Sequence, residues 1–258
     1  MGRNTTRGPG RRLDERLVED GLAPSRSRAQ ALVLSGVVLV DDSPVDKPGT
    51  RVAASAAVRL RGGVRQFVSR GGEKLAGALE DLGVDVAHLH CLDIGASTGG
   101  FTDCLLQAGA TGVVALDVGR GQLHSKLVQD DRVHALERTN ARHLEAGMLP
   151  FPVQLVVADV SFISLRLLLP AIGASAPGAR LLLMVKPQFE VGREQVGKGG
   201  VVRDDVLRAE AVASVVACAA EHGYALCGQA DSRLAGPKGN REVFVLLEPS
   251  GDGPSPAS

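Results

Sequence analysis

The sequence predicts an α/β protein in which a doubly wound, mostly parallel sheet follows a small α+β unit. Three observations lead to this prediction. Apolar segments typical of strands alternate with helical segments in the later part of the chain, a glycine-rich turn follows the first of these strands, and basic residues concentrate ahead of it. The chain has 258 residues, 44% of them hydrophobic, which suffices for one large or two modest domains with an ordinary core.

The first unit is expected to hold two short helices and a few short strands. An amphipathic helix begins at Leu13, and Ser25 is the expected cap of a second helix over residues 26–34. A strand is predicted over residues 37–40, and the apolar segment 56–60 closes the unit.

A formal net charge of zero conceals an uneven distribution of charge. Residues 1–74 contain 14 Lys and Arg against 8 Asp and Glu, a net charge of +6, whereas the remaining residues carry 15 against 21, a net charge of −6. A basic module attached to an acidic domain is typical of a protein that docks on phosphate. The alternative is a solvated basic face without a partner.

The first unit resembles the small RNA-binding domain named after a small-subunit ribosomal protein. The segments that carry this resemblance are residues 12–14, 25–30, 36–40 and 47–49. The resemblance and the basic residues imply contacts with RNA phosphates, at a helix start for two of the arginines. Because the chain has no Trp and only 3% aromatic residues, we expect binding to structured RNA by backbone and shape. The expected RNA-binding residues are Arg12, Arg26, Arg28, Lys47, Arg65 and Arg70.

The second unit is predicted to alternate strands and helices. A helix is expected to end at about Leu82, a long helix spans 204–222, and the last two strands are expected to form a hairpin. The predicted strands cover residues 91–94, 112–116, 133–136, 154–158, 179–185, 225–230 and 243–247.

A glycine-rich turn after the first of these strands predicts a nucleoside cofactor. Asp93 begins the pattern D-x-G-x-x-x-G-G, and Asp117 ends the next strand, where a carboxylate meets ribose hydroxyls in Rossmann-like sheets. Gly95 would give the tight turn, while Gly99 and Gly100 would leave room for the cofactor. The spacing differs from the G-x-G-x-x-G of dinucleotide sites, which disfavours an oxidoreductase, and resembles the first motif of S-adenosylmethionine-dependent methyltransferases.

The candidate cofactor-binding residues are Asp93, Gly95, Gly99, Gly100, Phe101, Asp117 and Asn140. Asn140 is expected near the adenine, although an ordinary polar loop residue explains it equally well. A glycine-rich turn without any ligand is the alternative for the whole set.

Four charged residues stand where ligands bind in such sheets, at or near strand ends. Asp159 and Lys186 each end an apolar strand, Glu242 precedes the last strand, and Lys74 lies at the start of a helix. Charged residues next to apolar strands are costly unless they are paired or used in function. A structural network of salt bridges is the alternative to a catalytic group.

These four residues match the Lys-Asp-Lys-Glu tetrad of FtsJ-like ribose 2′-O-methyltransferases, and the chain resembles the TlyA family in particular. The resemblance rests on residues 69–75, 117–123, 159–164, 186–190 and 236–242, and it extends from Arg11 to Leu247. It implies a class I methyltransferase sheet, S-adenosylmethionine as cofactor, and 2′-O-methylation of cytidine in ribosomal RNA of the small and, in some members, the large subunit. Phe67 departs from the family, which usually has Tyr or Trp there.

The resemblance also implies a domain division. We expect tails over residues 1–10 and 249–258, an RNA-binding domain over 11–60, a basic linker over 61–73, and a methyltransferase domain over 74–248.

The tetrad suggests a division of labour in methyl transfer. A lysine that accepts the hydroxyl proton must first be neutral, which a second ammonium and partial desolvation both favour. We assign Lys186 as the base or alkoxide-stabilising group and Lys74 as the residue that tunes and orients it. Asp159 and Glu242 would fix the geometry and balance the charge.

Composition limits the remaining possibilities. Cys91, Cys104, Cys218 and Cys227 show no C-x-x-C spacing, which predicts reduced core residues in a cytoplasmic protein and no metal site. No apolar run is long enough to span a bilayer, so we expect no membrane partner. The family resemblance implies ribosomal RNA or ribosomal subunits as partners, and we expect neither DNA nor a stable protein partner. Two alternative functions are those of a non-catalytic ribosome-assembly factor and of a pore-forming haemolysin. The first leaves the tetrad and the glycine-rich turn unexplained, and the second predicts membrane-lytic segments, for which residues 204–222 are the only long amphipathic candidate.

Overall fold

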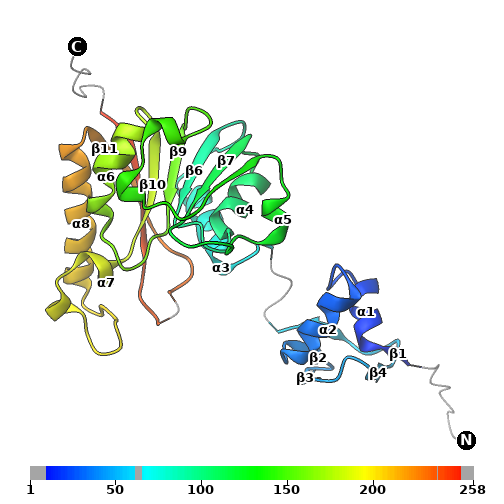
Figure 1. Cartoon of the computed structure of the whole chain (residues 1–258). Coiled ribbons are helices and arrows are strands. Elements are labelled where there is room, and N and C mark those ends of the chain that lie inside the picture. Colours follow the sequence, from blue (N-terminus) through cyan, green and yellow to red (C-terminus); the bar gives the residue numbers. More distant parts are fainter. Residues whose placement is uncertain (1–9, 62–65, 237, 251–258) are drawn as a thin grey trace, which may run out of the picture. The chain divides into compact units, whose positions relative to one another are not determined.

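The computed structural model describes residues 10–61, 66–236 and 238–250, and the chain divides into two compact units, 1–65 and 66–258 (Figure 1). Residues 1–9 and 251–258 of the expected tails, and 62–65 of the expected linker, lie outside the described residues. Arg65, an expected RNA-binding residue, is among them.

The first unit packs two helices against short antiparallel strands. Strand β2 pairs with β3 and β5, and β1 pairs with β4. The Ser25 hydroxyl caps α2 by accepting from the backbone N–H of Arg28 at 3.3 Å, as expected from the sequence. Its elements are β1 (Arg11–Arg12), α1 (Leu13–Glu19), α2 (Arg26–Leu34), β2 (Val38–Val40), β3 (Ser43–Pro44), β4 (Arg51–Val52) and β5 (Val58–Leu60).

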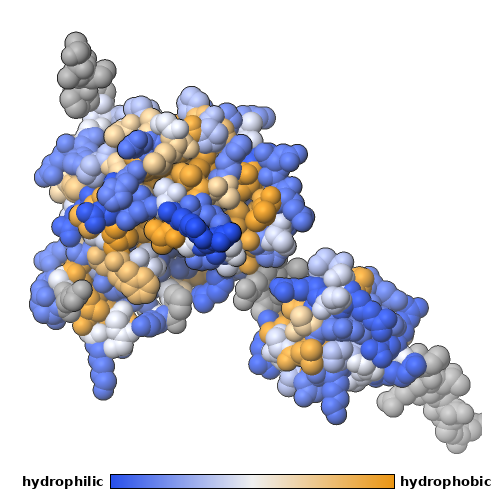
Figure 2. Space-filling view, in the orientation of Figure 1, coloured by the Kyte–Doolittle hydropathy of each residue, from blue (hydrophilic) through white to orange (hydrophobic). Residues whose placement is uncertain are grey.

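The core of the first unit is small and made of aliphatic side chains from both helices and the strands. Leu13, Leu17 and Val33 are fully buried in it. Figure 2 shows that hydrophilic side chains cover most of the visible face of this unit.

The second unit is built on a seven-stranded sheet of order β11-β12-β10-β9-β6-β7-β8. Strand β12 runs antiparallel to both of its neighbours, whereas β10, β9, β6, β7 and β8 are mutually parallel. The strands are β6 (His90–Ile94), β7 (Gly112–Leu116), β8 (Val133–Leu136), β9 (Leu155–Ala158), β10 (Arg180–Val185), β11 (Tyr224–Asp231) and β12 (Val243–Pro249). The prediction of a doubly wound, mostly parallel sheet with a final hairpin and one antiparallel strand is confirmed.

Helices cover both faces of this sheet (Figure 1). On one face α3 (Arg70–Asp81), α4 (Gly100–Gln107) and α5 (Ser125–Val128) pack on the sheet, and on the other α6 (Leu169–Ser175) and α8 (Asp205–Glu221) do. Successive residues of β10 serve opposite layers, because strand side chains alternate: Leu182 joins the first layer and Leu181 the second. Shorter elements are α7 (Pro187–Glu190) and the 3₁₀ turns η1 (Ala141–His143), η2 (Ala146–Met148), η3 (Leu165–Leu167) and η4 (Arg193–Gln195).

Residues 66–73, expected to be the second half of the linker, belong instead to the second unit. The Phe67 side chain is buried, the backbone N–H of Val68 donates to Asp103 of α4 at 2.8 Å, and α3 begins at Arg70. Gly72 allows α3 to approach α4 and Phe67 closely. A Cβ on Gly72 would lie 2.4 Å from the Phe67 side chain and 2.8 Å from the carbonyl oxygen of Gly100.

Within the described residues, no helix combines the length and the apolar character needed to cross a bilayer.

Candidate active site

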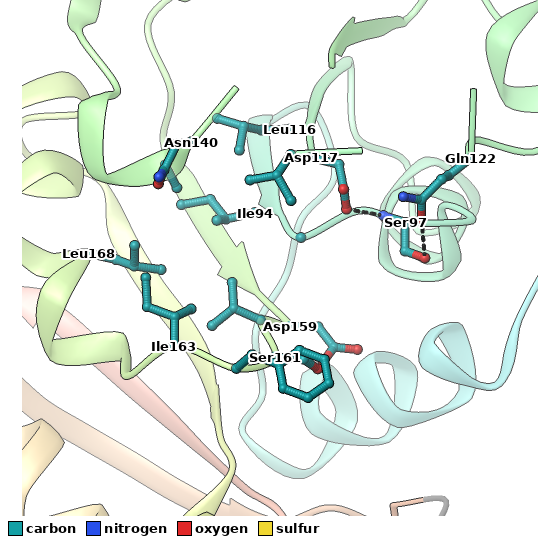
Figure 3. Close-up of a pocket in the computed structure, with 15 residues that line it drawn as sticks. Ile94, Ser97, Leu116, Asp117, Gln122, Asn140, Asp159, Ser161, Ile163 and Leu168 are labelled. Carbon is teal, nitrogen blue, oxygen red and sulfur yellow. Dashed lines mark hydrogen bonds between the residues drawn. The ribbon is translucent and has the colours of Figure 1, made fainter. Parts of the chain in front are cut away.

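A cavity of about 470 Å³ opens at the carboxyl ends of β6, β7 and β9, the edge at which open α/β sheets bind ligands (Figure 3). Apolar side chains make one wall and polar groups gather at the loop ends. None of the described residues that line it carries a positive charge. The lining residues are Ile94, Gly95, Ser97, Leu116, Asp117, Val118, Gln122, Asn140, Ala141, Asp159, Val160, Ser161, Phe162, Ile163 and Leu168.

Gly95 is the glycine of the predicted turn that faces this cavity. Its φ is +84°, and a Cβ there would lie 2.7 Å from the carbonyl oxygen of Asp159. Any side chain would therefore push the end of β6 away from the end of β9. Gly95 brings the two loops together at the cavity floor.

Gly99 and Gly100 serve a different purpose from the one expected. A Cβ on Gly99 would lie 2.2 Å from Leu127 Cδ1, and one on Gly100 would lie 2.1 Å from Ser69 Oγ. Both glycines make room for neighbouring protein elements, and neither lines the cavity. Their position just after the turn predicts room for a ligand. The prediction fails because spacing alone does not show which side of a turn is enclosed by protein.

Asp93 and Phe101 also lie behind the cavity wall. Asp93 is fully buried, and its Oδ2 accepts from the backbone N–H and the hydroxyl of Thr102 at 2.9 and 2.7 Å, which ties β6 to α4. The pKa of Asp93 is raised to about 7, chiefly by burial and in part by the carboxylates of Asp159 and Asp117, while the hydrogen bonds from Thr102 lower it. Phe101 is buried against Phe244, with ring centroids 6.1 Å apart.

Asp117 organises the rim of the cavity (Figure 3). Its Oδ2 accepts from the backbone N–H of Ser97 at 2.9 Å, and its Oδ1 accepts from that of Gly119 at 2.7 Å. The Ser97 hydroxyl in turn donates to Gln122 Oε1 at 3.1 Å. Because each carboxylate oxygen can accept two hydrogen bonds and accepts one backbone N–H here, Asp117 keeps the capacity to receive a pair of ligand hydroxyls.

Asn140 stands at the opposite side of the same cavity, among apolar side chains (Figure 3). Its Oδ1 accepts from the backbone N–H of Arg142 at 3.0 Å and so fixes the start of η1. Ile94, Leu116 and Leu168 supply apolar surface suited to the faces of an aromatic ring.

A second cavity, of about 390 Å³, adjoins the first and has Ser161 and Phe162 in common with it. It opens among the loops that follow β9 and β10 and that precede β12. Its lining residues are Ser161, Phe162, Lys186, Gln188, Phe189, Val196, Gly200, Gly236, Lys238, Asn240 and Glu242.

The four charged residues of the predicted tetrad form two separate ion pairs. Lys74 pairs with Glu242, and both side chains are buried. Lys186 Nζ lies 2.5 Å from Asp159 Oδ1, an oxygen that receives no hydrogen bond of normal geometry. Asp159 lines the first cavity, whereas Lys186 and Glu242 line the second.

This pairing gives Lys74 a structural role. Its ammonium is held by Glu242 and lines neither cavity, so it anchors the carboxylate on the wall of the second cavity, and the tuning of Lys186 by Lys74 stays a prediction. Lys186 has its own partners in Asp159 and in the hydroxyl of Ser161, which lies 3.0 Å from Nζ. Breaking a buried charge pair leaves one uncompensated charge, so the Lys74–Glu242 pair also stabilises this wall.

Two of the arginines expected to bind RNA are engaged within the first unit. Asp14 is fully buried and accepts from Arg12 through two bonds of 3.0 Å, from Arg26 at 3.1 Å and from Gln30 at 3.0 Å. These bonds, led by that from Arg12, hold the pKa of Asp14 well below its usual range. A sequence read for charge alone does not distinguish arginines that organise a fold from arginines that face solvent.

The other expected RNA-binding residues are more exposed. Arg28 and Lys47 are exposed, and the described part of the chain gives neither an ion-pair partner. Arg70 lies in the second unit, where its guanidinium donates to the carbonyl oxygen of Ala235 at 3.1 Å.

Comparison with known proteins places this geometry in a family. The FtsJ-like methyltransferase family matches residues 67–248, and the S4 domain matches residues 11–58. The 16S/23S rRNA (cytidine-2'-O)-methyltransferase TlyA of Mycobacterium tuberculosis is 49% identical over 93% of this chain and 91% of its own length. The chain belongs to the TlyA family of FtsJ-like methyltransferases.

Further relatives span nearly the whole chain. Hemolysin A of Brachyspira hyodysenteriae is 39% identical, covering 91% of this chain and 98% of its own. A solved structure from Streptococcus thermophilus is 40% identical, with a TM-score of 0.73, and covers 95% of this chain and 90% of its own.

The first cavity of this TlyA-family chain fits S-adenosylmethionine, the cofactor of the family. The cofactor has no phosphate, and none of the described lining residues is positively charged. Its sulfonium is positive, and Asp159 supplies a carboxylate at the boundary with the second cavity. Asp117 and the apolar wall line this cavity, and their contacts with the ribose and the adenine of the cofactor stay predictions.

Phe162 lies in the segment 159–164 that carries the family resemblance, but the sequence patterns assigned it no role in the site. Its side chain is 92% exposed, its φ is +67°, and its ring centroid lies 5.3 Å from that of Phe189. An exposed aromatic residue in the left-handed region is rare and points to function. Ser161 lies in the same segment, and Gln122 lies in the segment 117–123, which also carries the resemblance. None of the three was assigned to the site, because the resemblance alone does not show which of these side chains line a cavity.

Proposed function

We propose that this protein transfers the methyl group of S-adenosylmethionine to the ribose 2′-hydroxyl of cytidine in ribosomal RNA. The observation that carries the proposal is the meeting of two cavities beside Lys186, one suited to the cofactor and one open to an acceptor. The activity named for the Mycobacterium tuberculosis relative supports it. Because ribosomes are assembled in the cytoplasm, the protein would act there.

The residues around the second cavity suit a ribose hydroxyl as acceptor. Bound S-adenosylmethionine supplies an electrophilic methyl group. Lys186, held by Asp159 and Ser161, stands at the boundary, where it stabilises negative charge on the attacking oxygen or takes up its proton. Glu242, anchored by Lys74, fixes the opposite wall. This placement aligns the hydroxyl with the methyl group, and positioning supplies a large part of the rate.

Two features of the protein suit RNA as the carrier of that hydroxyl. Exposed Arg28 and Lys47 in the S4-like unit are available for phosphates. Phe162 offers an exposed ring beside the second cavity, and aromatic rings stack on bases that leave a helix.

Transfer of a labelled methyl group tests the proposal directly. Ribosomal subunits from cells that lack this protein are incubated with it and with tritiated S-adenosylmethionine. We expect label in the RNA with the wild-type protein and a loss of at least 100-fold in rate with Lys186→Ala. Full activity of a folded Lys186→Ala protein would refute the role of Lys186, and label on a base instead of a ribose would refute the reaction.

A non-catalytic ribosome-assembly factor is the second candidate, favoured by the S4-like unit, which would bind RNA in either case. It predicts no affinity for the cofactor. Calorimetry decides between the two: saturable binding of S-adenosylmethionine that Asp117→Ala weakens supports the enzyme, and absence of binding supports the assembly factor.

A further inference from the structure

The boundary between the two cavities is made by Ser161 and Phe162, the two residues that line both. They follow β9 directly after Asp159 and Val160. A group that passes from the first cavity to an acceptor in the second must pass this pair. Of the two side chains, the hydroxyl of Ser161 exchanges protons and the ring of Phe162 does not.

Ser161 is connected to the lysine already placed in the reaction. Its Oγ lies 3.0 Å from Lys186 Nζ, and Nζ lies 2.5 Å from Asp159 Oδ1. At 3.0 Å the hydrogen bond runs in either direction, since an ammonium donates to the hydroxyl and a neutral amine accepts from it. The hydroxyl keeps a further lone pair for a ligand in the second cavity.

The turn that carries Ser161 is fixed to the segment that follows Lys186. The Glu190 carboxylate, 7% exposed, accepts from the Ser164 hydroxyl at 2.5 Å and from the backbone N–H of Leu165 at 2.8 Å. Arg166 donates to the backbone carbonyl oxygen of Glu190 at 3.2 Å. These bonds join the loops after β9 and β10, so the Ser161–Lys186 distance is set before substrate binds.

We propose that Ser161 is a further catalytic residue, which relays the proton of the acceptor hydroxyl to Lys186. The inference rests on the proposed function. As the acceptor oxygen bonds to the methyl carbon, the bond from that carbon to sulfur breaks and its electron pair stays on sulfur. Before this step the Lys186 ammonium releases one proton to solvent; the acceptor proton then moves to Ser161 Oγ, and the Ser161 hydroxyl proton moves to the Lys186 amine. The resulting ammonium is stabilised by Asp159.

Variants at Ser161 test the relay. In single-turnover methyl transfer to ribosomal subunits that lack the modification, Ser161→Ala is expected to lower the rate constant about 10- to 100-fold. Ser161→Thr keeps the hydroxyl and should stay within a few-fold of wild type. Because Ser161 also lines the first cavity, the rates are compared at saturating S-adenosylmethionine, with the affinity of each variant measured by calorimetry. Ser214→Ala, which removes a hydroxyl bonded within α8, is the control and should leave the rate unchanged.

A double variant separates a relay from two independent effects. If Ser161 acts through Lys186, the protein with Ser161→Ala and Lys186→Ala should be no slower than Lys186→Ala alone. Equal slowing by Ser161→Ala in both backgrounds would overturn the relay, as would a Ser161→Ala rate within twofold of wild type. A wild-type protein that methylates neither subunit would instead overturn the proposed function itself.

Discussion

At the scale of single residues, the geometry of Phe162 indicates contact with a partner. Its φ of +67° lies in the left-handed region, it exposes 92% of its side chain, and it lines both the cavity suited to the cofactor and the cavity open to an acceptor. A large exposed ring contributes little to stability, so its position is best explained by contact with a partner. Stacking on an acceptor base would hold the ribose beside Lys186.

Phe162→Ala should therefore impair transfer to RNA. We expect methyl transfer to fall by about 10-fold or more, because base–aromatic stacking is worth roughly 1–3 kcal/mol. The rates are compared at saturating S-adenosylmethionine, because Phe162 also lines the first cavity, and the melting temperature should change little. Phe162→Tyr keeps the ring and should remain active. Equal activity of the Ala variant and the wild-type protein would exclude a stacking role.

Asp93 gives the protein a predictable response to pH. Burial raises its pKa to about 7, so the carboxyl is neutral in the folded protein below that pH, whereas in the unfolded chain it ionises near pH 4. Stability in the absence of cofactor should therefore decrease as pH rises from about 4 through 7, by an amount on the order of 3 kcal/mol. Urea unfolding at pH 5 and pH 8 measures the decrease.

Asp93→Asn should reduce that decrease, because the amide is neutral at both pH values and still accepts from Thr102. Exposed Asp131→Asn serves as the control and should retain the wild-type dependence. The account of Asp93 fails if the Asn variant loses as much stability between pH 5 and pH 8 as the wild-type protein.

At the scale of elements, the site depends on close approach between loops and helices around the glycine turn. Gly99 has a φ of +90°, and a Cβ there would lie 2.2 Å from Leu127 of α5. Gly99→Ala should destabilise the second unit by roughly 1–3 kcal/mol through backbone strain and overpacking. Gly147→Ala is the matched control, since no atom lies within 4 Å of a Cβ there and its φ is negative. Thermal unfolding of both variants checks this, and equal melting temperatures would contradict it.

The elements were more predictable than their contacts. The alternating apolar segments predicted the strands of the sheet. Asp159 and Lys186 each follow a strand, and because parallel strands end at the same edge of a sheet, the sequence also predicted that the two residues lie at one edge. The partner of Lys74 was not predictable, since Glu242 comes from a loop 168 residues later in the chain. The exposure of Phe162 depends on how the loop after β9 packs against its neighbours, which no local sequence pattern encodes.

At the scale of the whole molecule, the S4-like unit should govern affinity for RNA and the methyltransferase unit the chemistry. Arg28→Ala with Lys47→Ala should weaken binding to ribosomal subunits and lower the slope of log affinity against log salt by about one for each lost phosphate contact. Affinity for the cofactor should not change. Binding measured at several salt concentrations gives this slope.

Arg12→Ala provides the contrasting variant within the same unit. Because Arg12 bonds a buried carboxylate, its loss should destabilise the first unit by roughly 1–3 kcal/mol, an effect that unfolding experiments detect. Comparable destabilisation by Arg28→Ala, or an unchanged salt slope in the double variant, would contradict the division between structural and RNA-facing arginines.

Mapping of ribose methylation in ribosomal RNA by mass spectrometry tests the central claim most directly. RNA is compared from cells that lack this protein and from the same cells supplied with the wild-type protein or with Lys186→Ala. We predict that 2′-O-methylcytidine appears with the wild-type protein and is absent with Lys186→Ala. Identical maps in all three samples, or a new methyl group on a base, would contradict the account.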